Sequence, residues 1–162
     1  PYAILIFVVL ALLSLFILKF TSLGNQIYAV GGNERAATLS GIKTKRIKLF
    51  VYMFSALMAA ICSMINTSQL RAAHPAAGES WEMNAIASVV LGGTSMSGGI
   101  GTIGGTIVGA LVINVLNDGM TMMGVSSFWQ QVIRGVVIVV AVVIDQLQAS
   151  LQKKIALQLR NQ

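Results

Sequence analysis

The stretch IYAVGGNERAATLSGIKTKRIK, residues 27–48, is the one long polar and basic passage in a strongly apolar chain. Hydrophobic residues make up 56% of the 162 residues and charged residues only 10%, whereas soluble domains carry about 25% charged residues. The apolar runs 2–18 and 49–65 flank the stretch, and a third run covers 128–144. Each run approaches the roughly 17 to 25 residues that a helix needs to cross about 30 Å of hydrocarbon. The composition therefore predicts an all-α, polytopic membrane helix bundle.

The chain begins inside an apolar run. No basic segment precedes this run, and the sequence KFTS that follows it is a poor cleavage site, so we expect a mature helix rather than a signal peptide. Because the sequence starts at Pro1 rather than Met, we also expect a piece of a longer polypeptide. Cys62, which lies within a spanning run, is the single cysteine of the sequence. A disulfide inside the chain is therefore excluded.

The charges around the apolar runs predict their orientation. Between Glu34 and Lys48, five cations accompany a single anion. Short loops rich in Lys and Arg stay in the cytoplasm, so we expect a cytoplasmic loop over residues 24–48, held there by its basic end. The tail, residues 146–162, has the same bias and is expected to be cytoplasmic.

The opposite loop, residues 66–82, carries one cation and two acids and is expected outside. Its His74, the only histidine of the chain, is interpreted as a solvated loop residue. By parity, the following segment 83–119 must begin and end outside. It forms either two short spans or a re-entrant hairpin.

The sequence GGTSMSGGIGTIGG, residues 92–105, predicts a break in that segment. It holds seven glycines in fourteen residues, and glycine costs about 1 kcal/mol against alanine in a helix. Irregular backbone at membrane depth persists only where protein or a water-filled cavity satisfies its polar groups, so the break is a candidate element of a translocation pathway. The candidate pathway residues are Asn84, Gly92, Gly93, Thr94, Ser95, Asn114 and Asn117.

Two further features concern helix packing. Gly101, Gly105 and Gly109 stand four residues apart, and such a pattern on one helix face lets another helix approach closely. Arg134 lies near the outer end of the last run, where it can snorkel. We expect Asp118 or Glu82 to pair with it, and we favour this structural pairing over direct contact with substrate.

The sequence offers no catalytic or metal site and no cofactor site. Gly99, Gly101 and Gly104 match G-x-G-x-x-G, but no alternation of strand and helix surrounds them, so dinucleotide binding is not expected. The chain has no phosphate-binding loop of the G-x-x-x-x-G-K-[ST] type, so any ATP energy must come from another chain. The net charge of +6 is grouped beside apolar runs without interleaved aromatics. This pattern favours contact with membrane lipid over nucleic acid.

The centre of the polar stretch predicts a two-turn helix over residues 34–40. Asn33 is a good N-cap, Glu34 places negative charge in the first turn, and Gly41 is a natural stop. Ala36, Ala37 and Ser40 give this helix a small-residue face that could dock into a partner's groove. From composition alone, a solvated helix lying against its own bundle is equally compatible.

The stretch 27–48 resembles the cytoplasmic loop of inner-membrane permeases of ribose-type sugar ABC importers, which follow A-x-G-G-N-x-x-A-A-x-L-S-G-I. The later sequence SQLRAAHPAAGESWEMNAIASVVLGGTSMSGGIGTIGG and its continuation to Asp145 are similar to the carboxy-terminal half of the same family. The matches run in order from about Leu23 to Asp145.

This resemblance implies that residues 1–145 form the carboxy-terminal half of a permease domain in the bacterial inner membrane. It further implies a second permease subunit, a cytoplasmic ABC ATPase that holds ATP and Mg, and a periplasmic solute-binding protein. In such importers, a short cytoplasmic helix enters a cleft on the ATPase and transmits its closing motion. The residues implied for this coupling helix are Asn33, Glu34, Arg35, Ala36, Ala37, Leu39, Ser40 and Gly41.

The function favoured by these features is import of ribose or a related monosaccharide. Permeases for a nucleoside or a branched-chain amino acid share the broad architecture and stay open as alternatives. An ion-coupled secondary transporter is disfavoured because the centres of the clearest spans carry no charge. A purely structural membrane subunit is the remaining alternative.

Overall fold

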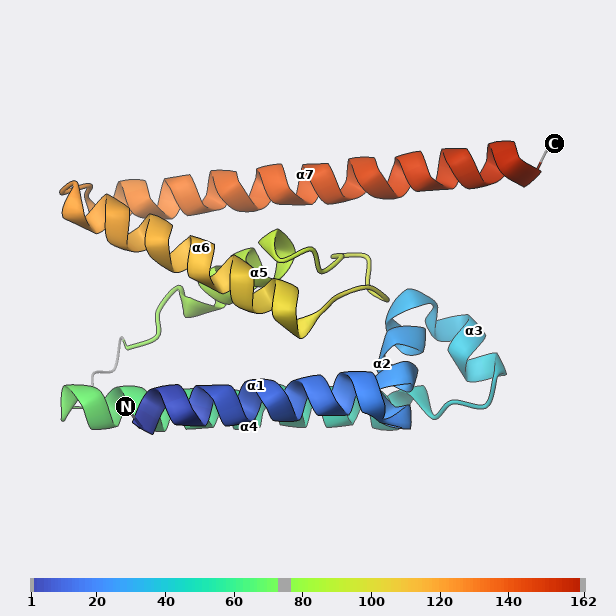
Figure 1. The fold of residues 1–162 in the computed structure, drawn as a ribbon, viewed down its shortest axis with the longest axis horizontal. Coiled ribbons are helices and arrows are strands. Elements are labelled where there is room, and N and C mark those ends of the chain that lie inside the picture. The colour runs from blue at the N-terminus through green and yellow to red at the C-terminus, as the bar shows by residue number, and fades with distance from the viewer. Residues whose placement is uncertain (1, 73–76, 161–162) are drawn as a thin grey trace. The chain divides into compact units, whose positions relative to one another are not determined.

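The computed structural model describes residues 2–72 and 77–160, with side chains of the last helix described as far as residue 147. Every regular element in these ranges is a helix (Figure 1), so the predicted all-α class is confirmed. His74 lies outside the described residues. The helices are α1 (Tyr2–Phe20), α2 (Ser22–Gly32), α3 (Glu34–Leu39), α4 (Thr44–Leu70), α5 (Trp81–Leu91), α6 (Ile103–Met122) and α7 (Ser127–Arg160).

Four helices of the described residues are long and apolar enough to cross a membrane: α1, α4, α6 and the part of α7 over Ser127–Leu147. None of the residues of α1 is buried, and large side chains such as Leu12 and Phe16 are 60% and 57% exposed. Such extensive apolar exposure is typical of a surface that faces lipid or further helices. The predicted polytopic membrane architecture agrees with these helices.

The chain forms two compact units. The first contains Pro1–Ser80 and Ser97–Ile103, and the second contains Trp81–Met96 and Gly104–Gln162. The first unit thus holds α1 to α4 together with part of the glycine-rich segment. The second holds α5, α7 and nearly all of α6.

In the first unit, α1 and α4 lie side by side and α2 folds back at the end of α1 (Figure 1). The Thr21 hydroxyl accepts a hydrogen bond from the Gly24 amide at 3.3 Å and donates one to the Ile17 carbonyl oxygen at 2.6 Å. A methyl group on Gly24 would overlap the Leu18 carbonyl oxygen. Residues 22–32 form a helix, whereas the sequence led us to expect that the loop begins at residue 24. The cap at Thr21 and the packing on α1 outweigh the low helix propensity of the glycines.

In the second unit, glycines bring α5 and α6 into direct backbone contact. A methyl group on Gly109 would overlap the Ser88 carbonyl oxygen, and one on Gly92 would overlap the Gly105 carbonyl oxygen. Ala87 and Ile113 beside this contact are 1% and 2% exposed. The core of the second unit is therefore centred on α5, which meets α6 through these glycines and also packs on α7.

The predicted packing stripe is only partly right. Gly105 and Gly109 lie on α6 and pack as expected, whereas Gly101 precedes the first residue of that helix, Ile103. The carbonyl oxygen of Gly101 instead accepts a hydrogen bond from the Tyr28 hydroxyl at 2.8 Å. The four-residue spacing extends to Gly101, which lies before the start of the helix, so the pattern predicted a stripe one glycine too long.

Contacts within the first unit show where the chain returns after α4. The chain leaves this unit at the Leu70 end of α4 and re-enters at Ser97–Ile103, where Ile103 and Ile27 line one cavity with Phe50. Phe50 lies near the opposite end of α4, a helix of 27 residues and so about 40 Å long. The two points at which the chain leaves and re-enters the first unit are therefore separated by most of that length.

This separation bears on the two alternatives left open for residues 83–119. Helix α5 has 11 residues and spans only about 16 Å, so the glycine-rich segment has to complete the crossing. Helix α6 has 20 residues and is long and apolar enough to cross by itself. These lengths favour two crossings, the first of them broken, over a re-entrant hairpin, and the choice between the two stays a prediction.

Candidate functional site

Helix α3 has well-formed caps at both ends, as the sequence predicts. At its start, the Asn33 side chain accepts a hydrogen bond from the Ala36 amide at 3.0 Å. At its end, the Gly41 amide donates to the Thr38 carbonyl oxygen and the Ile42 amide to that of Ala37, at 3.0 and 3.1 Å. These two bonds form a Schellman motif, which needs the left-handed φ of +84° that Gly41 adopts. The helix is Glu34–Leu39, with Ser40 as its C-cap.

One side of α3 packs inward and the rest is exposed. Ala37 is 5% exposed, whereas Leu39 is 89% exposed, and Arg35, Ala36 and Ser40 are exposed as well. The predicted small-residue face is therefore divided, because Ala37 packs within the unit and only Ala36 and Ser40 face outward. The outward surface is available to a partner, while the inward side fixes the helix to its own unit.

An ion pair ties the beginning of α3 to α4. Lys48 Nζ lies 2.7 Å from Glu34 Oε1, and both side chains are about half exposed. The buried Ile47 and Thr44 lie on the same first turns of α4. The sequence assigned Lys48 only a role in membrane orientation, because a pair fourteen residues apart in a loop carries no local signal. The structure adds a positional role for both residues.

The candidate pathway residues occupy separate places in the second unit. Asn84 lies on α5, where its Oδ1 accepts a hydrogen bond from Arg134 Nη1 at 3.3 Å. Gly92 packs on α6, and the Thr94 amide donates to the Val89 carbonyl oxygen at 3.1 Å, so that Gly93 and Thr94 end α5. On α6, Asn114 is exposed and Asn117 is half-buried. None of them lines either of the two cavities described below.

The partner predicted for Arg134 is wrong. Its guanidinium bonds the neutral amides of Asn84 and Gln130, the latter at 3.5 Å, rather than Asp118 or Glu82. Both acids are exposed on their helices, whereas Asn84 of α5 and Gln130 of α7 each place an amide oxygen within reach of the Arg134 guanidinium. Because Arg134 lies on the apolar part of α7, the amides satisfy part of its hydrogen-bonding capacity inside a spanning segment.

Asp145 is a functional candidate that the sequence did not identify. Its Oδ2 accepts hydrogen bonds from Ser95 Oγ at 3.1 Å and from the Met96 amide at 3.3 Å. The carboxylate thus fixes the irregular segment after α5 to α7, within the second unit. A lone acid at the end of an apolar run is the signal that could have indicated such a role.

The other half of the glycine-rich segment belongs to the first unit and lies on α2. A methyl group on Gly99 would come 2.8 Å from Gly32 Cα, and one on Gly98 would overlap the Gly31 carbonyl oxygen. Two pairs of consecutive glycines therefore meet backbone to backbone. One pair directly precedes Asn33, the N-cap of α3.

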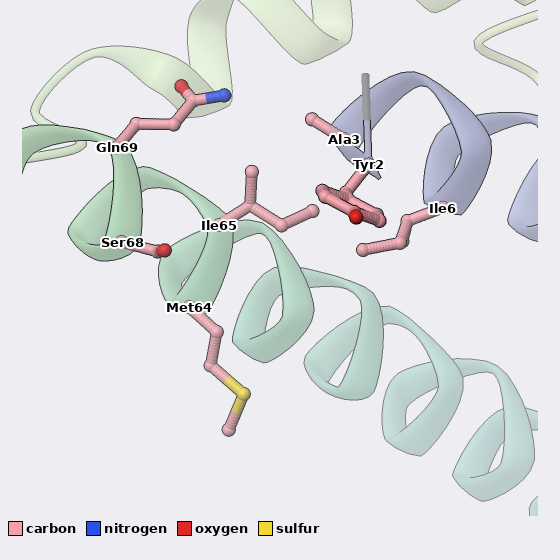
Figure 2. A pocket seen from close by; sticks show the side chains of 7 residues that line it. All are labelled: Tyr2, Ala3, Ile6, Met64, Ile65, Ser68 and Gln69. Atoms are coloured by element: carbon pink, nitrogen blue, oxygen red, sulfur yellow. The ribbon is translucent and has the colours of Figure 1, made fainter.

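Two cavities in the first unit have mainly apolar walls. The larger, of about 400 Å³, lies between α1 and α4, and Figure 2 shows Ile65 of α4 pointing toward Tyr2 of α1. Its polar groups are the Tyr2 hydroxyl and the side chains of Ser68 and Gln69. A sugar site requires several convergent polar groups, so this cavity does not have the character of one. The smaller, of about 170 Å³, is lined by Ser14, Ile17, Leu18, Ile27, Phe50, Val51, Phe54 and Ile103.

Comparison with known proteins assigns the chain to a family. A family profile described as the permease component of the branched-chain amino acid transport system matches residues 2–142. The ribose import permease protein of Bacillus subtilis is 51% identical over 139 residues, which are 85% of this chain and 43% of that protein. The ribose import permease protein of Escherichia coli K12 is 45% identical over 145 residues, 90% of this chain and 45% of that protein.

The xylose transport system permease protein of Haemophilus influenzae is 42% identical over 145 residues, 90% of this chain and 39% of that protein. The chain thus spans less than half the length of these relatives. No solved structure matches it. Because the profile covers most of the chain, with its four candidate spans, the chain belongs to the family of permease components described for branched-chain amino acid transport.

Proposed function

We propose that this chain is the carboxy-terminal part of the membrane permease of an ATP-driven importer for ribose or a related monosaccharide. The proposal is supported by family membership and by similarity to proteins named for ribose and xylose transport. The expected location is the bacterial inner membrane. The observation that carries the proposal is α3, a helix with both ends capped and an exposed outer surface.

The structural features of α3 support a role in coupling. A six-residue helix is marginal by itself in water, yet here caps, the buried Ala37 and the Glu34–Lys48 pair hold it in place. A rigid helix with its outer surface free can transmit a push from a partner. The partner we propose is the cytoplasmic ABC ATPase, which holds ATP and Mg.

In the proposed cycle, a periplasmic binding protein delivers the sugar to a dimer of permease subunits. Closing of the ATPase displaces α3, and the attached helices α2 and α4 move with it. The broken crossing over α5 and residues 92–102 then rearranges, so the pathway opens on alternate sides. This population shift requires that the ATPase bind the two states with different affinity.

The test uses the complete permease, its ATPase and its binding protein in proteoliposomes. We expect uptake of labelled ribose that depends on the binding protein and on ATP supplied on the side of the membrane that carries the ATPase. A catalytically inactive ATPase is the control and should abolish the uptake. Uptake that persists without ATP hydrolysis would contradict the proposal and favour a secondary transporter.

A second candidate substrate class follows from the family description, which names branched-chain amino acids. The same proteoliposomes distinguish the two classes when labelled leucine and a labelled nucleoside are offered in place of ribose. Uptake of leucine without uptake of ribose or xylose would favour the amino-acid alternative. Direct titration of the binding protein with each solute gives an independent measurement.

A further inference from the structure

The loop over residues 97–102 rests directly on the helix that leads into α3. A methyl group on Gly31 would lie 2.9 Å from the Gly99 amide nitrogen, a distance that forces one backbone to shift. The Tyr28 hydroxyl, one helical turn earlier, donates to the Gly101 carbonyl oxygen at 2.8 Å. No side chain separates the two backbones here, so a displacement of one acts directly on the other.

The last turn of α2 is joined as closely to α3. The Asn33 amide donates to the Ala29 carbonyl oxygen at 3.0 Å while the Asn33 side chain caps α3. One residue therefore terminates α2 and begins α3. Helix α3, the end of α2 and the loop form a continuous series of direct contacts inside one compact unit.

The loop is also joined by the chain to the second unit. It lies between Met96, whose amide bonds Asp145, and Gly104, in the first turn of α6. A shift of the loop therefore acts through the backbone on both crossings. The contact on α2 is placed where a movement of α3 can reach the glycine-rich segment.

The surroundings of the contact argue against a mainly structural role. Gly31 and Gly32 are exposed and Tyr28 is only half-buried, so the contact removes little apolar surface from water and contributes little to folding. Among the described residues of the first unit, the buried ones are Gly24 near the start of α2 and Ala37, Thr44 and Ile47 on α3 and α4, all away from this contact.

We propose that Tyr28, Gly31 and Gly99 are positioning residues that pass the displacement of α3 to the glycine-rich loop. They set the coupling between ATP hydrolysis and the opening of the broken crossing. This inference rests on the proposed function, because it assigns a route to the same coupling helix. It goes beyond that function in naming the contact through which the movement travels.

The experiment compares neighbouring glycines in the complete permease, assembled with its ATPase and binding protein in proteoliposomes. Gly31→Ala introduces the clash, whereas Gly32→Ala places a methyl group 3.8 Å from Gly99 Cα, an ordinary contact. Tyr28→Phe removes only the hydroxyl. The measurement is the number of labelled ribose molecules imported per ATP hydrolysed, together with the stimulation of hydrolysis by loaded binding protein.

We expect the sugar-to-ATP ratio to fall about 10-fold in Gly31→Ala and about 3-fold in Tyr28→Phe, and to change less than about 2-fold in Gly32→Ala. A merely structural defect lowers the amount of assembled complex and leaves the ratio unchanged. An unchanged ratio in Gly31→Ala, or equal losses in the two alanine variants, would overturn the inference.

If Gly31→Ala does not assemble, Tyr28→Phe decides, because it adds no atoms, and a wild-type ratio in that variant overturns the inference. Failure of the proposed function has a different outcome. In that case the wild-type complex itself shows no ATP-driven sugar import, and both proposals fall. Wild-type import with unaffected variants overturns the positioning role alone.

Discussion

The glycine contact between α5 and α6 and the glycine contact between α2 and the loop over residues 97–102 differ in their surroundings. Gly92, Gly105 and Gly109 join α5 to α6 beside Ala87 and Ile113, which are almost fully buried. Gly31 and Gly99 join α2 to a loop at an exposed helix end. The first contact lies in a packed core, so its disruption should cost stability. The second lies at the periphery, so its disruption should cost coupling.

The largest expected effect is on the core contact. Gly109→Ala places a methyl group on the Ser88 carbonyl oxygen, and α5 must move away from α6. We expect the free energy of unfolding in detergent to fall by about 2 to 3 kcal/mol. Gly104→Ala is the control, because a methyl group there meets open space. Equal stability of the two variants would show that the core contact is not close, and the comparison would fail.

A smaller effect is expected where the irregular segment is fixed to α7. Asp145→Ala removes the acceptor for Ser95 Oγ and the Met96 amide. The loss of two hydrogen bonds to a carboxylate should cost about 1.5 to 2 kcal/mol. Hydrogen exchange at the Met96 amide is the measurement, with the exposed Gln146→Ala as control. Unchanged exchange would mean that the segment keeps its conformation without Asp145.

The N-cap shared by α2 and α3 tests the peripheral region. Asn33→Ala leaves the Ala36 amide without its acceptor, and loss of such a cap costs about 1 kcal/mol. We expect faster hydrogen exchange along α3 with little change in global unfolding. Asn33→Ser keeps an acceptor and should restore protection. If Asn33→Ala destabilised the whole protein, the peripheral contact would belong to the core after all.

The smallest effect is expected for the ion pair between Glu34 and Lys48. Both side chains are about half exposed, so a double-mutant cycle with Glu34→Gln and Lys48→Met should give a coupling energy below about 1 kcal/mol. High salt should reduce it further. A larger or salt-independent value would contradict the view that α3 is held chiefly by its caps and Ala37.

The features that the sequence predicted are those with local signals. The cap at Asn33 and the stop at Gly41 are signals carried by single residues at the two ends of the helix. The bounds of α3 were therefore predicted almost to the residue. The glycine content of residues 92–105 likewise predicted the break after Leu91. Both predictions depend on backbone preferences that operate over a few residues.

The features that the sequence missed depend on tertiary structure. Tyr28 meets Gly101, and Asp145 meets Ser95, across distances in sequence that no local pattern covers. Arg134 was given an acidic partner because opposite charge is the only pairing signal in a sequence, whereas the fold offered it amides. The docking of α3 and the membrane orientation of the loops stay predictions.

The most direct measurement of the central claim is a crosslink from α3 to the ATPase. Leu39 on α3 and Met122 at the end of α6 are both 89% exposed, and the predicted topology puts them on opposite sides of the membrane. A photoreactive amino acid is placed at one position or the other in the complete importer. We predict a crosslink to the ATPase subunit from residue 39 and none from residue 122. No ATPase crosslink from residue 39, or equal yields from both positions, would contradict the account.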